Sequence, residues 1–144
     1  MSKAAVIDWE DLARRAEAVS KNAHAPYSRY PVGAALLVAS GRVFVGCNVE
    51  NASYGLSICA ERSVIVQMVA AGERDPVAIS VVTRGPIIGT PCGTCRQTLA
   101  EFAMDLPVHL FVEGQASAAR ITSLAELLPD AFRAAALPAL HVDK

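Results

Sequence analysis

The chain has 144 residues, of which 53% are apolar and 19% are charged. This balance excludes an intrinsically disordered chain, and the length predicts a single domain spanning residues 1–144 with its own core. Thirteen basic and fourteen acidic residues give a net charge of −1, so no overall positive field would gather nucleic acid or an anionic membrane. A small neutral ligand fits this charge better, and the surplus of apolar residues predicts contact with another subunit.

Membrane insertion and export are not expected. No apolar run approaches the roughly 18–20 residues that a membrane span needs. Asp8, Glu10 and Asp11 lie where a signal peptide would carry its apolar stretch. The sequence therefore predicts a soluble, cytoplasmic protein, in which thiols stay reduced and clustered cysteines bind metal more often than they form disulfides.

The first third of the chain predicts one helix followed by a β-hairpin. In residues 8–23 apolar side chains recur at spacings of three and four, which indicates an amphipathic helix with an acidic first turn that ends before Pro26. Two runs rich in β-forming residues, 32–38 and 42–47, are joined by Ala39-Ser40-Gly41. This connection is typical of a hairpin.

The rest of the chain alternates helices and strands. An apolar helix is predicted from about residue 59 to residue 71, before Gly72. A nearly continuous apolar run at residues 77–83 indicates a strand buried on both faces. The further predicted elements are a helix at about 92–103, a strand at 109–112, a weaker strand at 120–122 and a short helix at 124–128. Five strands among these helices predict a layered α/β sandwich with a mixed sheet.

Three of the four cysteines form the strongest chemical signal. Cys92 and Cys95 are three residues apart at the start of a predicted helix, so they share one helical face and can grip one ion. Cys59, which lies 33 residues upstream of Cys92, stands at the start of another predicted helix. A helix N-terminus stabilises thiolate over thiol, and thiolate is the form that binds zinc. The sequence therefore predicts one Zn²⁺ per chain, held by these three cysteines.

Three protein ligands leave one tetrahedral position for water, which distinguishes a catalytic zinc site from a closed structural site. Zinc lowers the pKa of such a water to about 7 in favourable sites. Glu61, two residues after Cys59, is the candidate general acid and base. Arg62 and Arg96 follow Cys59 and Cys92 by three and four residues. We expect both guanidinium groups to donate hydrogen bonds to the thiolates and to offset their charge.

A structural zinc knuckle is the alternative, because a lone C-x2-C is common in such sites. The missing second C-x2-C, the acid after Cys59 and a core large enough to fold without metal stand against it. A non-enzymatic, zinc-stabilised interaction module would share this structural role and would unfold on chelation. His24, His109, His141 and Cys47 are not expected to complete the site, and Cys47 fits a small buried strand residue.

These segments closely resemble the cytidine deaminases, in particular the short homotetrameric type with three cysteine ligands. The similarity covers essentially the whole chain. It runs through residues 26–28, 31–36, 46–54, 59–62, 91–96 and 127–132. The resemblance implies a three-layer α/β/α sandwich with a central mixed five-stranded sheet. It also implies zinc-dependent hydrolysis of cytidine and 2′-deoxycytidine to uridine and 2′-deoxyuridine, with release of ammonia, in pyrimidine salvage.

The resemblance also implies roles for individual residues. Glu61 would move protons between water, N3 of the pyrimidine and the departing amine. Asn48 and Glu50 would hydrogen-bond the ribose 3′-hydroxyl, and the backbone of Ala60 would contact the polar edge of the pyrimidine. Tyr54 and Phe132 are expected in nucleoside pockets that are shared between the subunits of a homotetramer.

Three features depart from the family pattern. Tyr30 stands where Phe usually lines the nucleoside pocket, Thr94 replaces a commoner Ala between the cysteines, and residues 84–90 follow no family pattern. A deaminase of another base is an alternative, for example of a tRNA adenosine, a polynucleotide cytosine or an aminonucleoside antibiotic of the blasticidin type. Asn48 and Glu50 favour a free nucleoside, because a polynucleotide uses the 3′-hydroxyl in its backbone.

Overall fold

The protein is built around one five-stranded sheet. The computed structural model describes residues 5–138, and the strand order is β2-β1-β3-β4-β5. The strands are β1 (Val32–Val38), β2 (Val43–Cys47), β3 (Pro76–Thr83), β4 (Pro107–Val112) and β5 (Arg120–Ser123). Among these strands β3 and β4 pair in parallel and the other neighbours pair antiparallel. The predicted mixed sheet of five strands is confirmed.

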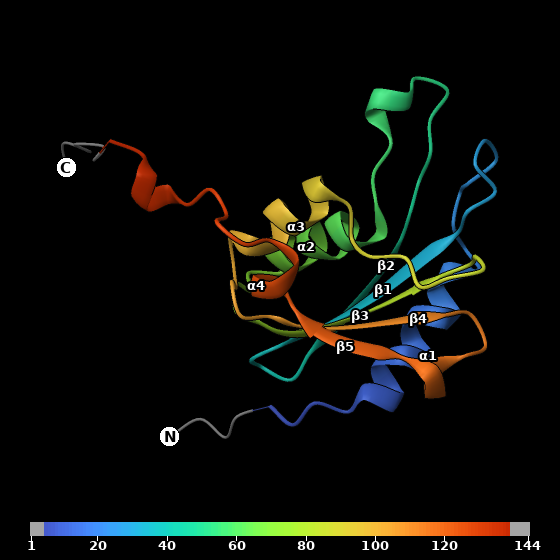
Figure 1. Ribbon diagram of the computed structural model, residues 1–144, viewed down its shortest axis with the longest axis horizontal. Coiled ribbons are helices and arrows are strands. Elements are labelled where there is room, and N and C mark those ends of the chain that lie inside the picture. The colour runs from blue at the N-terminus through green and yellow to red at the C-terminus, as the bar shows by residue number, and fades with distance from the viewer. Residues whose placement is uncertain (1–4, 139–144) are drawn as a thin grey trace.

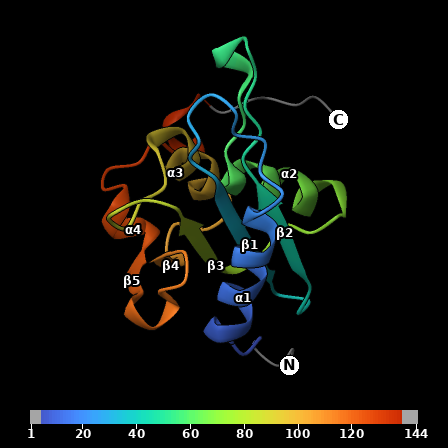
Figure 2. The ribbon, with the colours of Figure 1, turned by 90° about the vertical axis from the view of Figure 1, so that its right-hand side faces the viewer.

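Helices cover both faces of the sheet and complete three layers (Figures 1 and 2). The helices are α1 (Trp9–Ser20), α2 (Ala60–Ala70), α3 (Gly93–Ala100) and α4 (Leu124–Leu127), and short 3-10 turns lie at Tyr54–Leu56, Ala116–Ala118 and Ala134–Ala136. Helix α1 packs on one face, while α2, α3 and α4 lie on the other face (Figure 1). The predicted α/β/α sandwich is therefore confirmed.

Strand β1 shows how the sequence forms two separate cores. Successive side chains of a strand point to opposite faces. Leu36 and Val38 accordingly join the core beneath α2 and α3, whereas Ala35 and Leu37 join the core beneath α1. All four are buried, so a strand in the middle of the sheet has to be apolar along its length.

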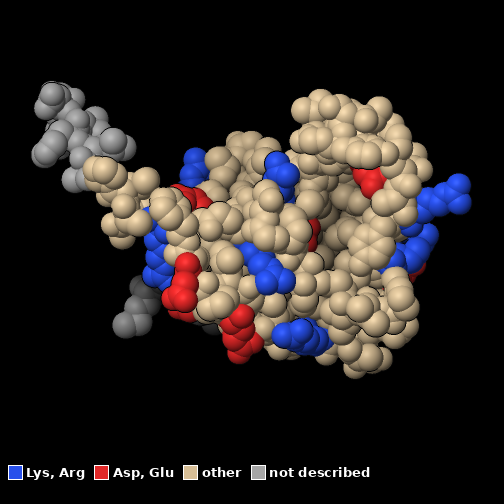
Figure 3. All heavy atoms as spheres, turned by 45° about the horizontal axis from the view of Figure 1, so that its top comes forward, with Lys and Arg blue, Asp and Glu red and all other residues tan. Residues whose placement is uncertain are grey.

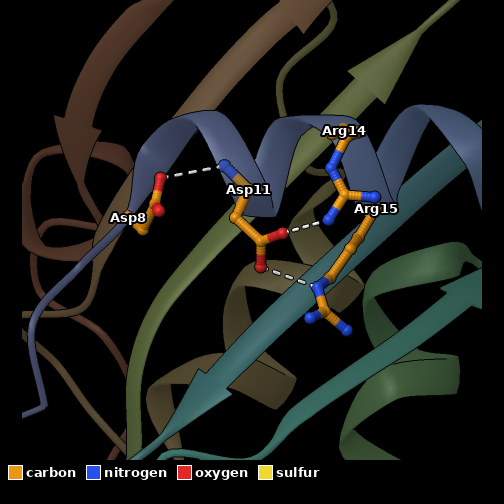
Figure 4. Close-up of polar contacts among 4 residues, drawn as sticks. All are labelled: Asp8, Asp11, Arg14 and Arg15. Atoms are coloured by element: carbon orange, nitrogen blue, oxygen red, sulfur yellow. Dashed lines mark hydrogen bonds and ion pairs between the residues drawn. The ribbon is translucent and has the colours of Figure 1, made fainter.

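Helix α1 begins where Asp8 accepts a hydrogen bond from the backbone N–H of Asp11 at 3.0 Å. Asp11 in turn pairs with Arg14, and with Arg15 at 2.7 Å, along the exposed side of the helix (Figure 4). The helix lies close to β1, because a Cβ on Gly33 would stand only 2.0 Å from the carbonyl oxygen of Ala16. Glycine at this position lets the helix backbone approach the sheet.

Two helices end earlier than the hydrophobic pattern predicts. Helix α1 stops at Ser20 and not at residue 23, because the chain turns there so that His24 can form backbone hydrogen bonds with Asn48 and Glu50. Helix α3 stops at Ala100 and not at residue 103. The carbonyl of Leu99 there accepts from two backbone N–H groups, those of residues 102 and 103, which tightens the chain into a turn.

The start of α2 and the end of its last turn match the prediction within one residue. Cys59 is the N-cap residue, and Gly72 follows the helix with a φ of +85°, a conformation that glycine adopts without strain. The helices in the part of the chain described, residues 5–138, are all too short or too polar to cross a bilayer.

Candidate active site

Three thiols meet at the starts of two neighbouring helices. Cys59 is the N-cap residue of α2, Cys92 is the N-cap residue of α3, and Cys95 lies in the first turn of α3. The sulfur of Cys92 is 3.9 Å from that of Cys59 and 3.5 Å from that of Cys95, and all three sulfurs lie within 4.8 Å of one another. Tetrahedral zinc with Zn–S bonds of about 2.3 Å requires sulfurs about 3.8 Å apart. The thiols therefore fit one zinc ion.

The fold explains why residues 33 positions apart in the sequence come together. Helices α2 and α3 lie on the same face of the sheet (Figures 1 and 2). Their N-cap residues, Cys59 and Cys92, lie close together, with the two sulfurs 3.9 Å apart. Backbone N–H groups at the two helix starts add positive potential around the sulfurs. The donor set and its surroundings thus favour a thiophilic divalent cation.

The thiols shift one another's pKa values. The Cys95 thiol hydrogen-bonds Cys59, and this bond, helped by Cys92 and the Arg62 charge, lowers the pKa of Cys59 to about 6. The same bond and burial raise the pKa of Cys95. The lowered pKa of Cys59 favours its thiolate, which is the form that binds a metal ion, and metal binding releases thiol protons.

Glu61 lies directly beside the cluster. Its side chain is 5% exposed, and its Oε2 is 3.7 Å from the sulfur of Cys95. Burial raises the pKa of Glu61 to about 7, and the charge of the Cys59 thiolate acts in the same direction. A carboxyl group with this pKa can both accept and donate a proton near neutrality.

A cavity of about 430 Å³ connects the thiols with the predicted nucleoside residues. Its walls include Cys59, Cys92, Ala60 and Glu61 together with Tyr30, Asn48 and Glu50. The remaining lining residues are Ser28, Val32, Ser57, Ile58, Thr83, Gly89 and Thr90. Its volume falls within the range of small-ligand sites. Seven of the predicted site residues thus line one cavity.

Asn48 and Glu50 are fixed by the backbone around the cavity. The Asn48 side chain accepts from the N–H of Val32 at 2.8 Å and donates to the carbonyl of Tyr30 at 2.9 Å. Glu50 Oε1 accepts from the N–H groups of Tyr27 and Ser28 at 2.9 and 3.1 Å. Hydrogen bonds, chiefly from Ser28, hold the pKa of Glu50 below its usual range. An amide and a carboxylate therefore line the cavity in fixed positions.

Tyr30 reaches the cavity wall with its hydroxyl group against the glycine-containing segment 84–90. A Cβ on Gly89 would stand 2.6 Å from the Tyr30 hydroxyl oxygen, and one on Gly85 would stand 3.2 Å from the Tyr30 ring. The backbone N–H of Gly89 donates to the hydroxyl of Thr83 at 3.2 Å. Two departures from the family pattern thus fit each other, because Gly89 makes room for the Tyr30 hydroxyl and Gly85 makes room for the ring.

Tyr54 and Phe132 are not among the residues that line this cavity, although Tyr54 lines an adjoining cavity that shares Ser28, Glu50 and Ser57 with it. Tyr54 is 74% exposed on the projecting segment between β2 and α2 (Figure 1), where its ring and that of Tyr27 form an edge-to-face pair with centroids 5.7 Å apart. Phe132 is 61% exposed in the segment after α4. Their predicted roles in a neighbouring subunit's pocket therefore stay predictions.

Arg96 departs from the role expected for it. Its guanidinium donates to the carbonyl oxygens of Pro91 at 2.7 Å and Leu127 at 2.5 Å, and to the hydroxyl of Thr90 at 2.9 Å. These acceptors replace the expected thiolates, because the loop before α3 and the end of α4 present carbonyls within reach. Arg96 thus braces the loop that carries Cys92. The Arg62 charge contributes to the lowered pKa of Cys59, and its predicted hydrogen bond to a thiolate stays a prediction.

The residues set aside as ligands lie elsewhere or outside the description. His109 lies inside β4, buried, with Nδ1 2.8 Å from the Ser80 hydroxyl and its ring stacked on Trp9 at 5.2 Å. This group belongs to the core beneath α1, on the face opposite the thiols. Cys47 is half-buried at the end of β2, where burial raises its pKa, and His141 lies outside residues 5–138.

The sequence interpretation missed part of the cavity wall. Ser28, Ser57, Thr83 and Thr90 line the cavity, although none of them was singled out for the site. Ser28 carries a usable signal, because it belongs to the Pro-Tyr-Ser segment that precedes β1. Thr83 carries none, since a threonine at the end of a strand is ordinary.

Comparison with known proteins agrees with this geometry. Residues 7–109 match the family model for the cytidine and deoxycytidylate deaminase zinc-binding region. The chain is 46% identical over 131 residues to a cytidine deaminase of Halalkalibacterium halodurans. The alignment covers 89% of this chain and 96% of that protein. It is 42% identical over 130 residues to a cytidine deaminase of Sporosarcina psychrophila, covering 88% and 92%.

Solved structures give the same result. The crystal structure of a cytidine deaminase from Burkholderia pseudomallei superposes with a TM-score of 0.83 at 45% identity, covering 88% of this chain and all (100%) of that chain. A cytidine deaminase from Mycobacterium tuberculosis gives a TM-score of 0.75 at 40% identity, with coverage of 88% and 98%.

Proposed function

Because this chain belongs to the family of zinc-binding cytidine and deoxycytidylate deaminases and is a hydrolase, we propose that it deaminates both cytidine and 2′-deoxycytidine, yielding uridine, 2′-deoxyuridine and ammonia. One observation carries the proposal. Glu61, a buried carboxyl group, stands beside three thiols in a cavity that also contains Asn48 and Glu50. Pyrimidine salvage in the cytoplasm is the setting that we propose for this reaction.

Cys59, Cys92 and Cys95 would hold the zinc ion. When bound, zinc lowers the pKa of a water, which makes the water a nucleophile near neutral pH. Glu61 takes one proton from the attacking water and gives it to N3 of the pyrimidine as the oxygen adds to C4. The same carboxyl group then takes the proton of the new hydroxyl group on C4 and gives it to the amino group, so that the C4–N bond breaks, ammonia leaves and the C4 carbonyl forms.

Asn48 and Glu50 would bind the sugar through its 3′-hydroxyl. Glu50 is ionised at neutral pH because hydrogen bonds lower its pKa, so it serves as an acceptor, and the Asn48 amide serves as donor or acceptor. Neither role requires a 2′-hydroxyl, which supports activity on both ribose and deoxyribose. Tyr30 forms an aromatic wall, and the backbone of Ala60 faces the polar edge of the pyrimidine.

A homotetramer would place Tyr54 and Phe132 of one subunit in the pockets of its neighbours. Large exposed apolar side chains support such association. They include Tyr54, Leu56, Val66, Ile121 and Phe132. Light scattering at micromolar concentration should give four times the mass of the chain, and a monomeric mass would refute the shared pockets.

The substrate class is tested by ammonia release. The purified, zinc-loaded protein is incubated with cytidine, 2′-deoxycytidine, cytosine, adenosine and blasticidin S. Ammonia is expected from the first two compounds. Release from adenosine or blasticidin S alone would overturn the proposal. A polynucleotide substrate is disfavoured because the Lys and Arg side chains on the face in Figure 3 are scattered and form no continuous basic track there.

A further inference from the structure

The C-terminal segment, defined as residues 128–138, is not held in place by apolar packing. Beyond Leu128, Ala131 is partly buried, and the other residues described up to residue 138 are exposed. The segment extends to one side of the molecule after α4 (Figure 1). Polar contacts are therefore the interactions that can restrain its path.

Two consecutive side chains of α3 make polar contacts with this part of the chain, one just before the segment and one within it. Arg96 donates to the carbonyl of Leu127 at 2.5 Å, at the end of α4. Gln97 Nε2 then donates to the main-chain carbonyl of Phe132 at 2.9 Å. Between these points the chain changes direction at Asp130, whose φ is +54°. The start of the segment is thus fastened to the helix that carries Cys92 and Cys95.

The hydrogen bond from Gln97 restrains the backbone that carries the Phe132 ring. A ring that is 61% exposed points in a defined direction only if its backbone is held. Within residues 5–138, the hydrogen bond from Gln97 is the one side-chain hydrogen bond that Phe132 receives. Without this hydrogen bond the backbone at Phe132 would move more freely, and the ring would adopt several orientations.

We propose that Gln97 is a positioning residue for the nucleoside pocket of a neighbouring subunit. It acts through Phe132, whose ring it orients from the metal-bearing helix of its own subunit. The inference rests on the proposed function, since it requires pockets that are shared between subunits. Orientation of a binding contact affects the ground state and the transition state equally, so the expected effect is on KM and not on kcat.

The first test replaces Gln97. Gln97→Ala and the shape-matched Gln97→Met both remove the donor, and each should raise KM for cytidine about fivefold, the change expected for one lost hydrogen bond. The kcat, the zinc content and the mass in solution should not change. Gln67→Ala is the matched control, because Gln67 also donates from a helix to a main-chain carbonyl, that of Val45 at 2.8 Å. Its KM should equal that of the unmodified protein.

A second background separates positioning from a merely structural role. Phe132→Ala keeps the main-chain carbonyl, so the Gln97 bond survives in this variant although the ring is gone. Phe132→Ala should raise KM, and adding Gln97→Ala should raise it no further. The same addition should still accelerate tryptic cleavage after Arg133, which is exposed in the C-terminal segment.

The outcomes are distinguishable. An unchanged KM in Gln97→Ala, an equal rise in both backgrounds, or no effect of Phe132→Ala would each overturn the role of Gln97. A protein that releases no ammonia from any nucleoside would refute the proposed function instead, while the cleavage assay would still show whether Gln97 holds the segment.

Discussion

Replacing Glu61 by Gln should stabilise the metal-free protein. The carboxyl group is buried, and its pKa rises from 4.5 to about 7 on folding. Because one pKa unit corresponds to about 1.36 kcal/mol, holding this group costs the folded state about 3 kcal/mol once the pH exceeds about 7. Gln has a similar shape and no charge, so the substitution removes that cost.

The sign of the effect depends on pH. Below pH 4.5 the carboxyl group is protonated in both states, and the two proteins should be equally stable. Between pH 4.5 and about 7 the unfolded chain ionises first, so the unmodified protein loses stability with rising pH and Glu61→Gln does not. Above about pH 7 the difference should stay constant at about 3 kcal/mol, on the order of 10 °C in melting temperature.

Urea titrations followed by circular dichroism would measure this difference. They are run with chelator and reductant at one protein concentration, since subunit association shifts apparent stability. Glu101→Gln, at an exposed position just after α3, is the matched control and should change stability by less than about 0.5 kcal/mol. Equal stabilities of Glu61→Gln and the unmodified protein at pH 8 would refute the reasoning.

With zinc restored, the same variant should bind one metal ion per chain. Its turnover of cytidine should fall by about 10³-fold or more, because the carboxyl group serves in two proton transfers. Full turnover at full zinc occupancy would reject the proton-transfer role of Glu61.

Three further outcomes are expected. Chelation should abolish deamination while far-UV circular dichroism retains most of its signal, since two apolar cores lie outside the thiol cluster; unfolding on metal loss would point to a structural site instead. Burial lowers the pKa of His109, so the unfolded state takes up a proton first and stability should fall as the pH drops below about 6.5. His109→Gln should flatten this part of a urea-stability profile, and identical slopes would contradict it. Gly89→Ala should raise KM for cytidine, because the new methyl group would crowd the Tyr30 hydroxyl; adding Tyr30→Phe should restore part of the loss, and no recovery would show that other contacts dominate.

The thiol site could be predicted because its signals are local. Cys92 and Cys95 share a helical face through their spacing alone, and Cys59 and Glu61 begin a helix that the apolar pattern already indicates. The layers could be predicted for the same reason, since the strands and helices differ in periodicity. What joins the two helix starts is tertiary structure. The shared zinc site was predicted from the cysteine pattern, and the family resemblance supplied the nucleoside contacts.

Contacts between distant side chains and backbone groups could not be predicted. The spacing of Arg96 from Cys92 suggested sulfur as its partner, but the carbonyl of Leu127, 31 residues later, accepts its hydrogen bond. The end of α1 was predicted wrongly for the same reason. The apolar pattern of α1 continues past Ser20, and the pairing of His24 with the segment after β2 decides where the helix stops.

The stack of Trp9 on His109 gives the molecule an internal optical reporter. The chain has a single tryptophan, and its indole lies on the α1 side of the sheet, 5.2 Å from the imidazole. Tryptophan emission, excited at wavelengths that the three tyrosines do not absorb, therefore reports on the docking of α1 and not directly on the thiol site, which lies on the opposite face of the sheet. If this emission stayed constant during a titration with chelator or nucleoside, the structural response to metal loss or binding would not extend to the α1 side of the sheet. No attached dye is needed for this measurement.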